Sequence, residues 1–535
     1  MFCRFKRVLL VFLVAFFAVT LVFAQSISEV RHGKYYGKTV ILHTNDVHGA
    51  LEGYAKLGAL KESFEAEGAD VLLVDAGDFA QGTIYVATTK GLNAVNIMNS
   101  VGYDIVGIGN HEFDYGFDML RTNLNHARFE ILCSDVFEEN GKTIYDRTTY
   151  RTLAGGAVVG FFELDTPETQ TKANPALMQG LSFTQGDDLY VLAQKLVDEL
   201  RTGGADTVIC ISHLGVNEAS TPNRAIDVME NTTGIDYMID GHSHTVYSSY
   251  EGYPMQQTGT KFAYIGVAIL DNVTGEVLDY YLADCNEIEP DSVLLAQAQS
   301  MMSQIDKEYG LKFAESRVEL NGERVPNRTG ETNLGDLIAD SMKWFISQNP
   351  SSINVPLEDL VAIENGGGIR DSIHAGDVSM KDINNVLPFG NTVTVVYVKG
   401  SALLEALEAS TFACPDQLGG FPQISGMNIT IDTTKAFDAG DLYPSSTYHA
   451  PASIKRVTIN DVNGKPFDPD ATYAVVTNDF VAAGGDTYYS FASSNTSFDT
   501  GYMLDDVLCQ YIKEVCNGVL DESNTKIDGR IKVIK

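Results

Sequence analysis

YDIVGIGNHEFD, residues 103–114, joins a short apolar run to a cluster of one glycine, one amide, one imidazole and two carboxylates. The apolar run is rich in β-branched residues, which is typical of a strand buried on both faces. Asn110, His111 and Asp114 follow this strand directly. So many polar groups at the end of a buried strand raise the question of which other side chains meet them.

Four other strand-like runs end in the same kind of cluster: KTVILHTNDVHG (38–49), ADVLLVDAGD (69–78), ADTVICISHLG (205–215) and IDYMIDGHSH (235–244). Helical stretches such as YAKLGALKESFEAEG (54–68) lie between several of them. Strand–helix–strand order predicts a largely parallel sheet, whose ligands collect beyond the carboxyl ends of its strands. We therefore predict that all five clusters lie on one rim. Their candidate metal ligands are Asp46, His48, Asp78, Asn110, His213, His242 and His244.

The chemistry of these side chains predicts which ions they hold. Each cluster alone fits an ordinary turn or helix cap, but five on one edge favour a metal centre. Carboxylate, imidazole and amide donors without a thiolate suit Zn²⁺, Mn²⁺, Fe²⁺ or Co²⁺. The donors are too numerous for one tetrahedral ion. Two ions about 3.5–4 Å apart that share a carboxylate would use them all and would assist displacement at a phosphoryl group.

These blocks resemble the calcineurin-like metallophosphatase signature, and in order and spacing the 5′-nucleotidase family, which includes bacterial UDP-sugar hydrolases and cyclic-nucleotide phosphodiesterases. The resemblance implies one metal held by Asp46, His48, Asp78 and His244, and another held by Asp78, Asn110, His213 and His242. Some members carry Gln in place of His244. The resemblance also gives His111, paired with Asp114, a role in transition-state stabilisation or leaving-group protonation.

The second half of the chain contains three further motifs: AIENGGGIRDSI (362–373), NVLPFGNTV (385–393) and VTNDFVAAGGDTYYSF (476–491). Alone, the first is a tight turn with a solvated arginine, and the phenylalanines of the others are core residues. The family resemblance instead implies nucleotide contacts and a base held between two aromatic rings, which tolerates different bases. The implied substrate residues are Arg328, Asn365, Arg370, Phe389, Asn391, Phe480 and Asp486. A further arginine of some members is replaced here by Gly330.

The length of 535 residues indicates two domains. The resemblance implies an α/β fold, with a four-layer αββα metallophosphatase domain over residues 38–290. A helix of apolar period within 291–315 would link it to an α+β nucleotide-recognition domain at 316–535.

The first 24 residues predict export, because three cations precede sixteen apolar residues and a V-F-A cleavage site. An uncleaved N-terminal anchor is the alternative. No other segment reaches the length of a membrane span. We expect a protein of the periplasm, the cell surface or the medium, without a stable membrane span after cleavage.

The net charge of −34 makes nucleic-acid polymers poor partners but does not exclude a small anionic nucleotide that meets metal ions or arginines. Six cysteines follow the signal, and their spacing predicts neither a zinc finger nor a pairing; Cys210, inside TVICI, is expected to be a buried thiol. The sequence does not indicate an oligomeric state.

The predicted activity is release of phosphate from nucleoside 5′-monophosphates, with UDP-sugars and other nucleotides as further substrates. A 2′,3′-cyclic-nucleotide 2′-phosphodiesterase with 3′-nucleotidase activity is the alternative within the same chemistry. A non-catalytic nucleotide-binding surface protein is the alternative from another class, and the complete set of metal-binding side chains argues against it.

Overall fold

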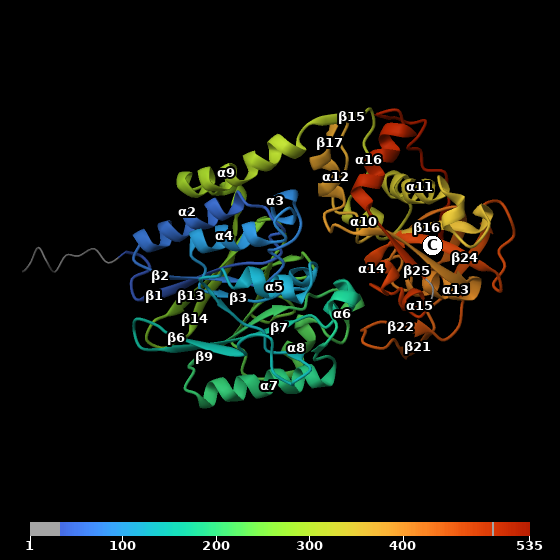
Figure 1. The fold of residues 1–535 in the computed structure, drawn as a ribbon. Helices are drawn as coiled ribbons and strands as arrows, with labels where there is room; N and C mark the ends of the chain where they lie inside the picture. Colours follow the sequence, from blue (N-terminus) through green and yellow to red (C-terminus); the bar gives the residue numbers. More distant parts are fainter. Residues whose placement is uncertain (1–32, 495–496) are drawn as a thin grey trace, which may run out of the picture.

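The computed structural model describes residues 33–494 and 497–535 as two lobes that lie side by side (Figure 1). The predicted export signal at residues 1–24 lies outside the described residues. Within the described ranges, no helix combines the length and apolar character needed to cross a bilayer.

The N-terminal lobe contains two six-stranded sheets. The first has the order β14 (Val277–Asp284), β13 (Tyr264–Asp271), β1 (Lys38–Thr44), β2 (Asp70–Asp75), β3 (Ile105–Val106) and β4 (Glu130–Ile131). The second has the order β11 (Val246–Tyr247), β12 (Met255–Thr258), β10 (Tyr237–Ile239), β9 (Thr207–His213), β7 (Val158–Asp165) and β6 (Thr148–Thr152). Strands β1 to β4 are parallel to one another, as are β7, β9 and β10.

The two sheets pack face to face through an apolar layer that includes Ile41, Phe161 and Ile209. Helices α2 (Gly53–Ala66), α4 (Leu92–Val101) and α9 (Ser292–Tyr309) cover the outer face of the first sheet, and α7 (Asp187–Thr202) and α8 (Ala225–Asn231) that of the second (Figure 1). This confirms the predicted αββα fold.

The expectation of one common sheet was wrong, because the five strands with polar ends divide between the two sheets. In an αββα sandwich every central strand is buried on both faces, against helices on one side and the other sheet on the other. Consecutive apolar residues therefore cannot distinguish one sheet from two. The parallel strands of both sheets nevertheless bring their polar ends to the same end of the sandwich.

The C-terminal lobe is built on a five-stranded mixed sheet of order β19 (Pro422–Ser425), β16 (Leu360–Asn365), β24 (Thr472–Asn478), β18 (Thr392–Lys399) and β25 (Ser497–Met503). Helices α11 (Asn333–Ser347) and α16 (Leu504–Glu514) pack on one face. The other face packs against α13 (Gly400–Ala409) and a small sheet of β23 (Val457–Val462), β20 (Met427–Asp432) and β27 (Ile531–Ile534).

Helix α9 lies in the interval 291–315 that we predicted to link the lobes. The Asp291 carboxylate caps its N-terminus by accepting from the backbone N–H groups of Val293 and Leu294. At its other end, the Asp306 carboxylate accepts from Lys381 Nζ (2.7 Å) on α12 (Met380–Val386) of the C-terminal lobe. The helix therefore packs on one lobe and contacts the other.

Candidate active site

The loops that follow β1, β2 and β3 of the first sheet meet the loops that follow β9 and β10 of the second. The backbone of several predicted ligands lies in the left-handed region, which side chains other than glycine rarely adopt. Such conformations persist at functional sites when the surrounding structure enforces them. The residues with positive φ are Asp46 (50°), His48 (46°), Asp78 (63°), His242 (73°) and His244 (56°).

One group of donor atoms comes from Asp46, His48, Asp78 and His244, all within 4.8 Å of one another. His48 Nε2 lies 3.0 Å from His244 Nε2 and 3.8 Å from an oxygen of both Asp46 and Asp78. Asp46 accepts hydrogen bonds at Oδ2, whereas its buried Oδ1 makes no hydrogen bond in the described part of the chain and lies 3.2 Å from His244 Nε2. His48 Nδ1 lies 3.2 Å from the Gln81 carbonyl, so Nδ1 donates and Nε2 keeps a lone pair.

A second group comes from Asp78, Asn110, His213 and His242. His213 Nε2 lies 3.1 Å from Asp78 Oδ2, and its Nδ1 donates to the Ala76 carbonyl at 2.6 Å. His242 Nδ1 lies 2.9 Å from Asn110 Oδ1, and its Nε2 lies 2.8 Å from Glu168 Oε2. The Asp78 carboxylate thus belongs to both groups.

Burial and neighbouring charge act in opposite directions on the pKa values of His213 and Asp78. Burial opposes the charged form of His213, but Asp78 outweighs it and holds the pKa of His213 well above its ordinary value. Burial likewise raises the pKa of Asp78, whereas His213 and His111 bring it well below the ordinary range. A bound cation would displace the proton that these two groups share.

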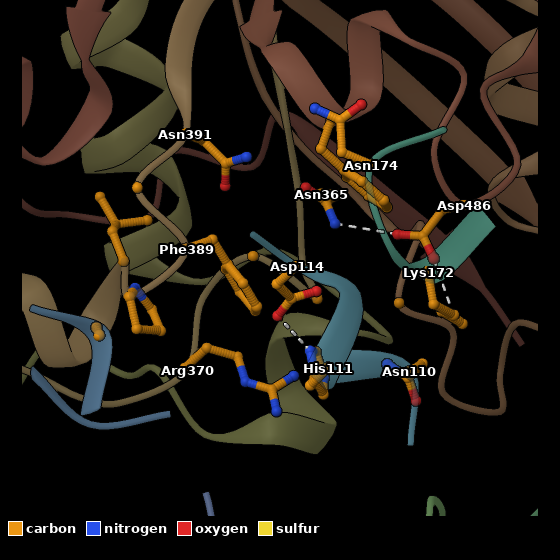
Figure 2. Close-up of a pocket in the computed structure, with 18 of the residues that line it drawn as sticks. Asn110, His111, Asp114, Lys172, Asn174, Asn365, Arg370, Phe389, Asn391 and Asp486 are labelled. Atoms are coloured by element: carbon orange, nitrogen blue, oxygen red, sulfur yellow. Dashed lines mark hydrogen bonds and ion pairs between the residues drawn. The ribbon is translucent and has the colours of Figure 1, made fainter. Parts of the chain in front are cut away.

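His111 and Asp114 lie together at the edge of this centre, on η1 (Asn110–Phe113) and directly after it. His111 Nδ1 lies 2.7 Å from Asp114 Oδ2 (Figure 2). The His111 ring stacks on Phe389 of the C-terminal lobe, with centroids 5.6 Å apart and planes at 27°. Asp114 therefore orients the ring, and His111 is positioned at the junction of the lobes.

Three arginines of the C-terminal lobe, Arg324, Arg328 and Arg370, line the same cavity as several of these donors. In the described ranges none of them forms an ion pair with a carboxylate. Arg324 Nη1 lies 3.1 Å from His244 Nδ1, and the Arg370 guanidinium lies 5.6 Å from the centre of the Phe389 ring. Burial lowers the pKa of Arg324 to about 10, and the neighbouring Arg370 adds to this effect. Arginine side chains that line a cavity without a carboxylate partner favour binding of an anion there.

The other predicted substrate residues surround the same space. Asn365 Nδ2 donates to Asp486 Oδ2 at 3.0 Å, and Lys172 Nζ donates to Asp486 Oδ1 at 2.9 Å (Figure 2). Asn391 Nδ2 and Asn174 Nδ2 both donate to the Asp479 carboxylate, at 2.8 and 3.0 Å. Lys172 and Asn174 come from the N-terminal lobe, so these contacts join the lobes beside the predicted base site.

These residues enclose a cavity of about 800 Å³, within the range of small-molecule sites. Residues from both lobes line it. All seven predicted substrate residues, including Phe389 and Phe480, are among them, as are Asp78, Asn110, His111, Asp114, His242 and His244. Asp46, His48 and His213 lie buried behind this lining.

Two family models match this chain along its length. One, described as calcineurin-like phosphoesterase, matches residues 39–246, and the other, described as 5′-nucleotidase, C-terminal domain, matches residues 312–493. The chain belongs to the 5′-nucleotidase family. It is therefore a hydrolase of phosphoric ester bonds.

Relatives in the 5′-nucleotidase family support the same assignment. The 5′-nucleotidase of Rattus norvegicus is 27% identical over 92% of this chain and 90% of its own length. A snake venom 5′-nucleotidase of Gloydius brevicauda is 28% identical, over 89% and 86%. The trifunctional nucleotide phosphoesterase protein YfkN of Bacillus subtilis is 28% identical over 92% of this chain, which spans only 35% of that relative. The crystal structure of a 5′-nucleotidase precursor from Thermus thermophilus superposes with a TM-score of 0.77 at 28% identity, over 93% and 99% of the chains.

Membership of the 5′-nucleotidase family implies divalent metals, and most of the predicted donors fit them. Asp46 Oδ1 makes no hydrogen bond within the described residues, and His213 Nε2 faces the Asp78 carboxylate at 3.1 Å. The hydrogen bonds at His48 Nδ1 and His242 Nε2 leave the other ring nitrogen of each histidine facing the site. His213 Nε2 would become a ligand when a cation replaces the proton that it shares with Asp78.

His244 fits less well. Arginine only donates, so Arg324 Nη1 at 3.1 Å requires a lone pair on His244 Nδ1. A neutral ring then carries its proton on Nε2, the nitrogen that faces His48 and Asp46. Binding of a metal at His244 Nε2 therefore requires Arg324 to leave Nδ1.

Two residues of the site, Arg324 and Lys172, were not predicted from the sequence, and support of its loop was the favoured interpretation of Glu112. The Glu112 carboxylate accepts from four backbone N–H groups at 2.8–2.9 Å and holds the loop of Asp78. Arg324 lies one helical turn before Arg328, on α10 (Arg324–Asn327). It adds a cation to a region where this chain has Gly330 in place of the arginine of some family members. Lys172 is the last residue of α6 (Thr169–Lys172), which contains no chemical motif, so no sequence signal indicated its contact with Asp486.

Proposed function

We propose that this enzyme hydrolyses nucleoside 5′-monophosphates, with the phosphate directed to the Asp46–Asp78–His213 end of the cavity and the base towards Phe389 and Phe480. The observation that carries the proposal is that three arginines, none of them in an ion pair with a carboxylate of the described residues, line the same cavity as metal-type donors. A phosphate monoester is an anion that could contact the arginines and the metal-type donors at the same time. The nucleotide motifs beside the arginines support a nucleoside as the rest of the substrate.

In this proposal the arginines and His111 act on the phosphoryl group directly. Arg370 and Arg328 bind its oxygens by charge-assisted hydrogen bonds and hold it against the donor groups. Two divalent cations held by the seven predicted ligands would supply Lewis-acid activation of water and neutralise developing charge. His111 donates a proton from Nε2 to the departing 5′-oxygen, while Asp114 accepts from Nδ1 and stabilises the imidazolium form.

Base recognition would depend on stacking rather than on a fixed hydrogen-bond pattern. Phe389 and Phe480 offer aromatic faces that accept any base. Asp486, which accepts hydrogen bonds from Asn365 and Lys172, would also accept them from ribose hydroxyl groups. We therefore expect several nucleoside monophosphates to be substrates.

Substitution Asp78→Asn tests the proposal, because Asp78 is the carboxylate common to both donor groups. The amide keeps the size of the side chain but removes its charge and one acceptor oxygen. Hydrolysis of AMP with Mn²⁺ present should fall by at least about 10²-fold. Turnover close to that of the native enzyme would contradict the shared-carboxylate centre.

A cyclic-nucleotide phosphodiesterase activity is the second candidate, because the same donor groups would serve either ester, and one relative is named a trifunctional nucleotide phosphoesterase, which acts on more than one kind of nucleotide ester by its name. Phosphate release from AMP, 3′-AMP, 2′,3′-cyclic AMP, UDP-glucose and NAD would separate the candidates. We expect the highest kcat/KM for AMP. A higher value for the cyclic phosphate or for 3′-AMP would replace the 5′-monophosphate assignment.

We further propose that the protein is exported, as its first 24 residues predict. Relatives named for snake venom are consistent with a role outside the cytoplasm. Fractionation of producing cells, followed by determination of the N-terminal residue of the mature protein, tests this. We expect Gln25 as the first residue, and retention of the intact chain in the cytoplasm would contradict export.

A further inference from the structure

A separate group of potential ligands lies between the two sheets of the N-terminal lobe. One donor atom each from Cys133, Asp135 and Glu163 lies within 4.8 Å of the others. All three side chains are fully buried. None of them belongs to the predicted catalytic ligands or lines the substrate cavity.

The backbone fixes the two segments that carry these residues. The Ser134 N–H donates to the Glu163 carbonyl, and the Glu163 N–H donates to Ser134 Oγ, both at 3.2 Å. The Asp165 N–H donates to Asp135 Oδ1 at 3.0 Å. The segment after β4 therefore runs along β7, which sets Cys133 and Asp135 beside Glu163.

The opposite sheet makes room for the Glu163 side chain. Gly107 follows β3, and a Cβ atom at this position would lie only 2.9 Å from Glu163 Cγ. Any other residue at position 107 would thus displace the Glu163 side chain. A glycine here places a carboxylate inside the sandwich, where an apolar residue would ordinarily pack.

The carboxylate oxygens that converge in this group have no partners. Both oxygens of Glu163 and Oδ2 of Asp135 are buried without a hydrogen bond in residues 33–494 and 497–535. Nearby Asp165 is different, because Thr166 N and Thr169 Oγ1 satisfy its carboxylate. Buried carboxylates without partners are rare, and they pair with cations or bind metals when they persist.

We propose that Cys133 Sγ, Asp135 Oδ2 and the Glu163 carboxylate bind one divalent cation, in addition to the ions of the active site. A thiolate with two carboxylates suits Zn²⁺ better than Mg²⁺ or Ca²⁺. Ligands of one tetrahedral zinc ion lie roughly 3.5 Å apart at bond lengths of about 2.0–2.3 Å. Small rotations of the three side chains would bring their donor atoms, which lie within 4.8 Å of one another, to that spacing.

The alternative occupant of the group is the proton. Without a cation, burial raises the pKa of Asp135 to about 8, and burial together with the charge of Asp135 holds the pKa of Glu163 well above its ordinary value. Burial also holds the pKa of the Cys133 thiol well above its ordinary value. Cation binding would release the thiol proton and those of the carboxyl groups to solvent.

The proposed ion would have a structural role. Asp165, two residues after Glu163, pairs in register with His213 of β9, so the ion would lie just behind a predicted catalytic ligand. It would join the segment after β4 to β7 and support that end of the sandwich. Because the group is fully buried, we expect loading during folding and slow exchange afterwards.

Cobalt provides a test that does not depend on catalysis. None of the seven predicted catalytic ligands is a thiol, so only a cysteine ligand can produce a sulfur-to-cobalt charge-transfer band in the near ultraviolet. The full chain is produced in cobalt-supplemented, zinc-depleted medium, and its absorption and cobalt content are measured. We expect the band in the native protein, its loss in Cys133→Ser, and a decrease of one cobalt per chain in that variant.

Two further variants separate this site from the active site and from general effects on thiols. Cys210→Ser removes another buried thiol, whose sulfur lies 3.6 Å from the Ile211 carbonyl, and should keep the band. Asp78→Asn should lose cobalt from the active site but also keep the band, so failure of the proposed function would leave this result unchanged.

The native protein alone decides the proposal if Cys133→Ser does not fold. The third ion is disproved if the native protein shows no thiolate-to-cobalt band and contains no more cobalt than the amount that Asp78→Asn loses. The group would then hold protons. A band that survives Cys133→Ser in folded protein would also overturn it, because another cysteine would be the ligand.

Discussion

At the scale of single residues, Glu112 determines the shape of the loop that carries Asp78. Its two oxygens accept from the backbone N–H groups of Asp78, Phe79, Ala80 and Gly109. In Glu112→Gln the amide nitrogen would face N–H donors. We expect metal affinity to fall about 10–100-fold, as for other groups that orient metal ligands, and excess Mn²⁺ to restore much of the rate.

Titration of activity against Mn²⁺ concentration measures this effect. Glu65→Gln, on the exposed side of α2, is the matched control and should titrate like the native enzyme. An unchanged titration curve for Glu112→Gln would show that the four N–H groups do not require a carboxylate.

A second residue, Glu364, makes stability depend on pH. Its side chain is buried at the end of β16, with a hydrogen bond of 3.0 Å from Asn478 Nδ2. Burial raises its pKa from 4.5 to about 8. Between these values the folded protein binds a proton that the unfolded chain does not, so stability falls as pH rises, by up to about 1.4 kcal/mol per pH unit.

Glu364→Gln removes this dependence, because the amide resembles the protonated acid at every pH. The difference in melting temperature between variant and native protein should be near zero at pH 5 and should favour the variant at pH 8. Glu522→Gln, at an exposed position, should give the same small difference at both. A difference for Glu364→Gln that does not grow with pH would disprove the raised pKa.

At the scale of elements, α6 (Thr169–Lys172) connects the lobes through its last residue. The Lys172 side chain is 19% exposed, and that of its partner Asp486 only 3%. Lys172→Met would leave a buried carboxylate that keeps only Asn365. We expect a loss of about 3–5 kcal/mol in the free energy of unfolding, and a partial recovery in the double variant with Asp486→Asn.

Lys381 provides the matched control for Lys172, since its ion pair with Asp306 also crosses between the lobes but is 29% and 42% exposed. Lys381→Met should cost less than about 1 kcal/mol. Denaturant unfolding measures both. Equal losses for the two variants would mean that the Lys172 pair is no more important than a surface contact.

The sequence predicted the elements of this site better than their arrangement. The strand before Asn110 and the clusters after the other four strands are visible as apolar runs with polar ends. The division into two sheets is not, because strands of both sheets are apolar on both faces. The left-handed backbone at Asp78 and the contact of Arg324 with His244 depend on loops that meet only in three dimensions.

At the scale of the whole molecule, the predicted metals join loops from both sheets of the N-terminal lobe and none from the C-terminal lobe. Chelation with EDTA should therefore lower the unfolding temperature of the first lobe more than that of the second. Saturation at 100 times Kd stabilises a folded state by about 2.7 kcal/mol. Differential scanning calorimetry should resolve two transitions, of which only one moves.

Addition of Mn²⁺ after removal of EDTA should restore that transition. In Asp78→Asn, which lacks the carboxylate common to both donor groups, EDTA should lower the unfolding temperature of the first lobe much less than in the native protein. If both transitions moved together, the lobes would unfold as one unit; if neither moved, the predicted centre would contribute nothing to stability.

The positive φ angles at Asp46, His48, Asp78, His242 and His244 limit how this centre could be copied. A designer who grafted only the seven ligands onto ordinary turns of another scaffold would aim them in wrong directions. The graft would also need the bends themselves, together with a counterpart of Glu112 to keep them in place.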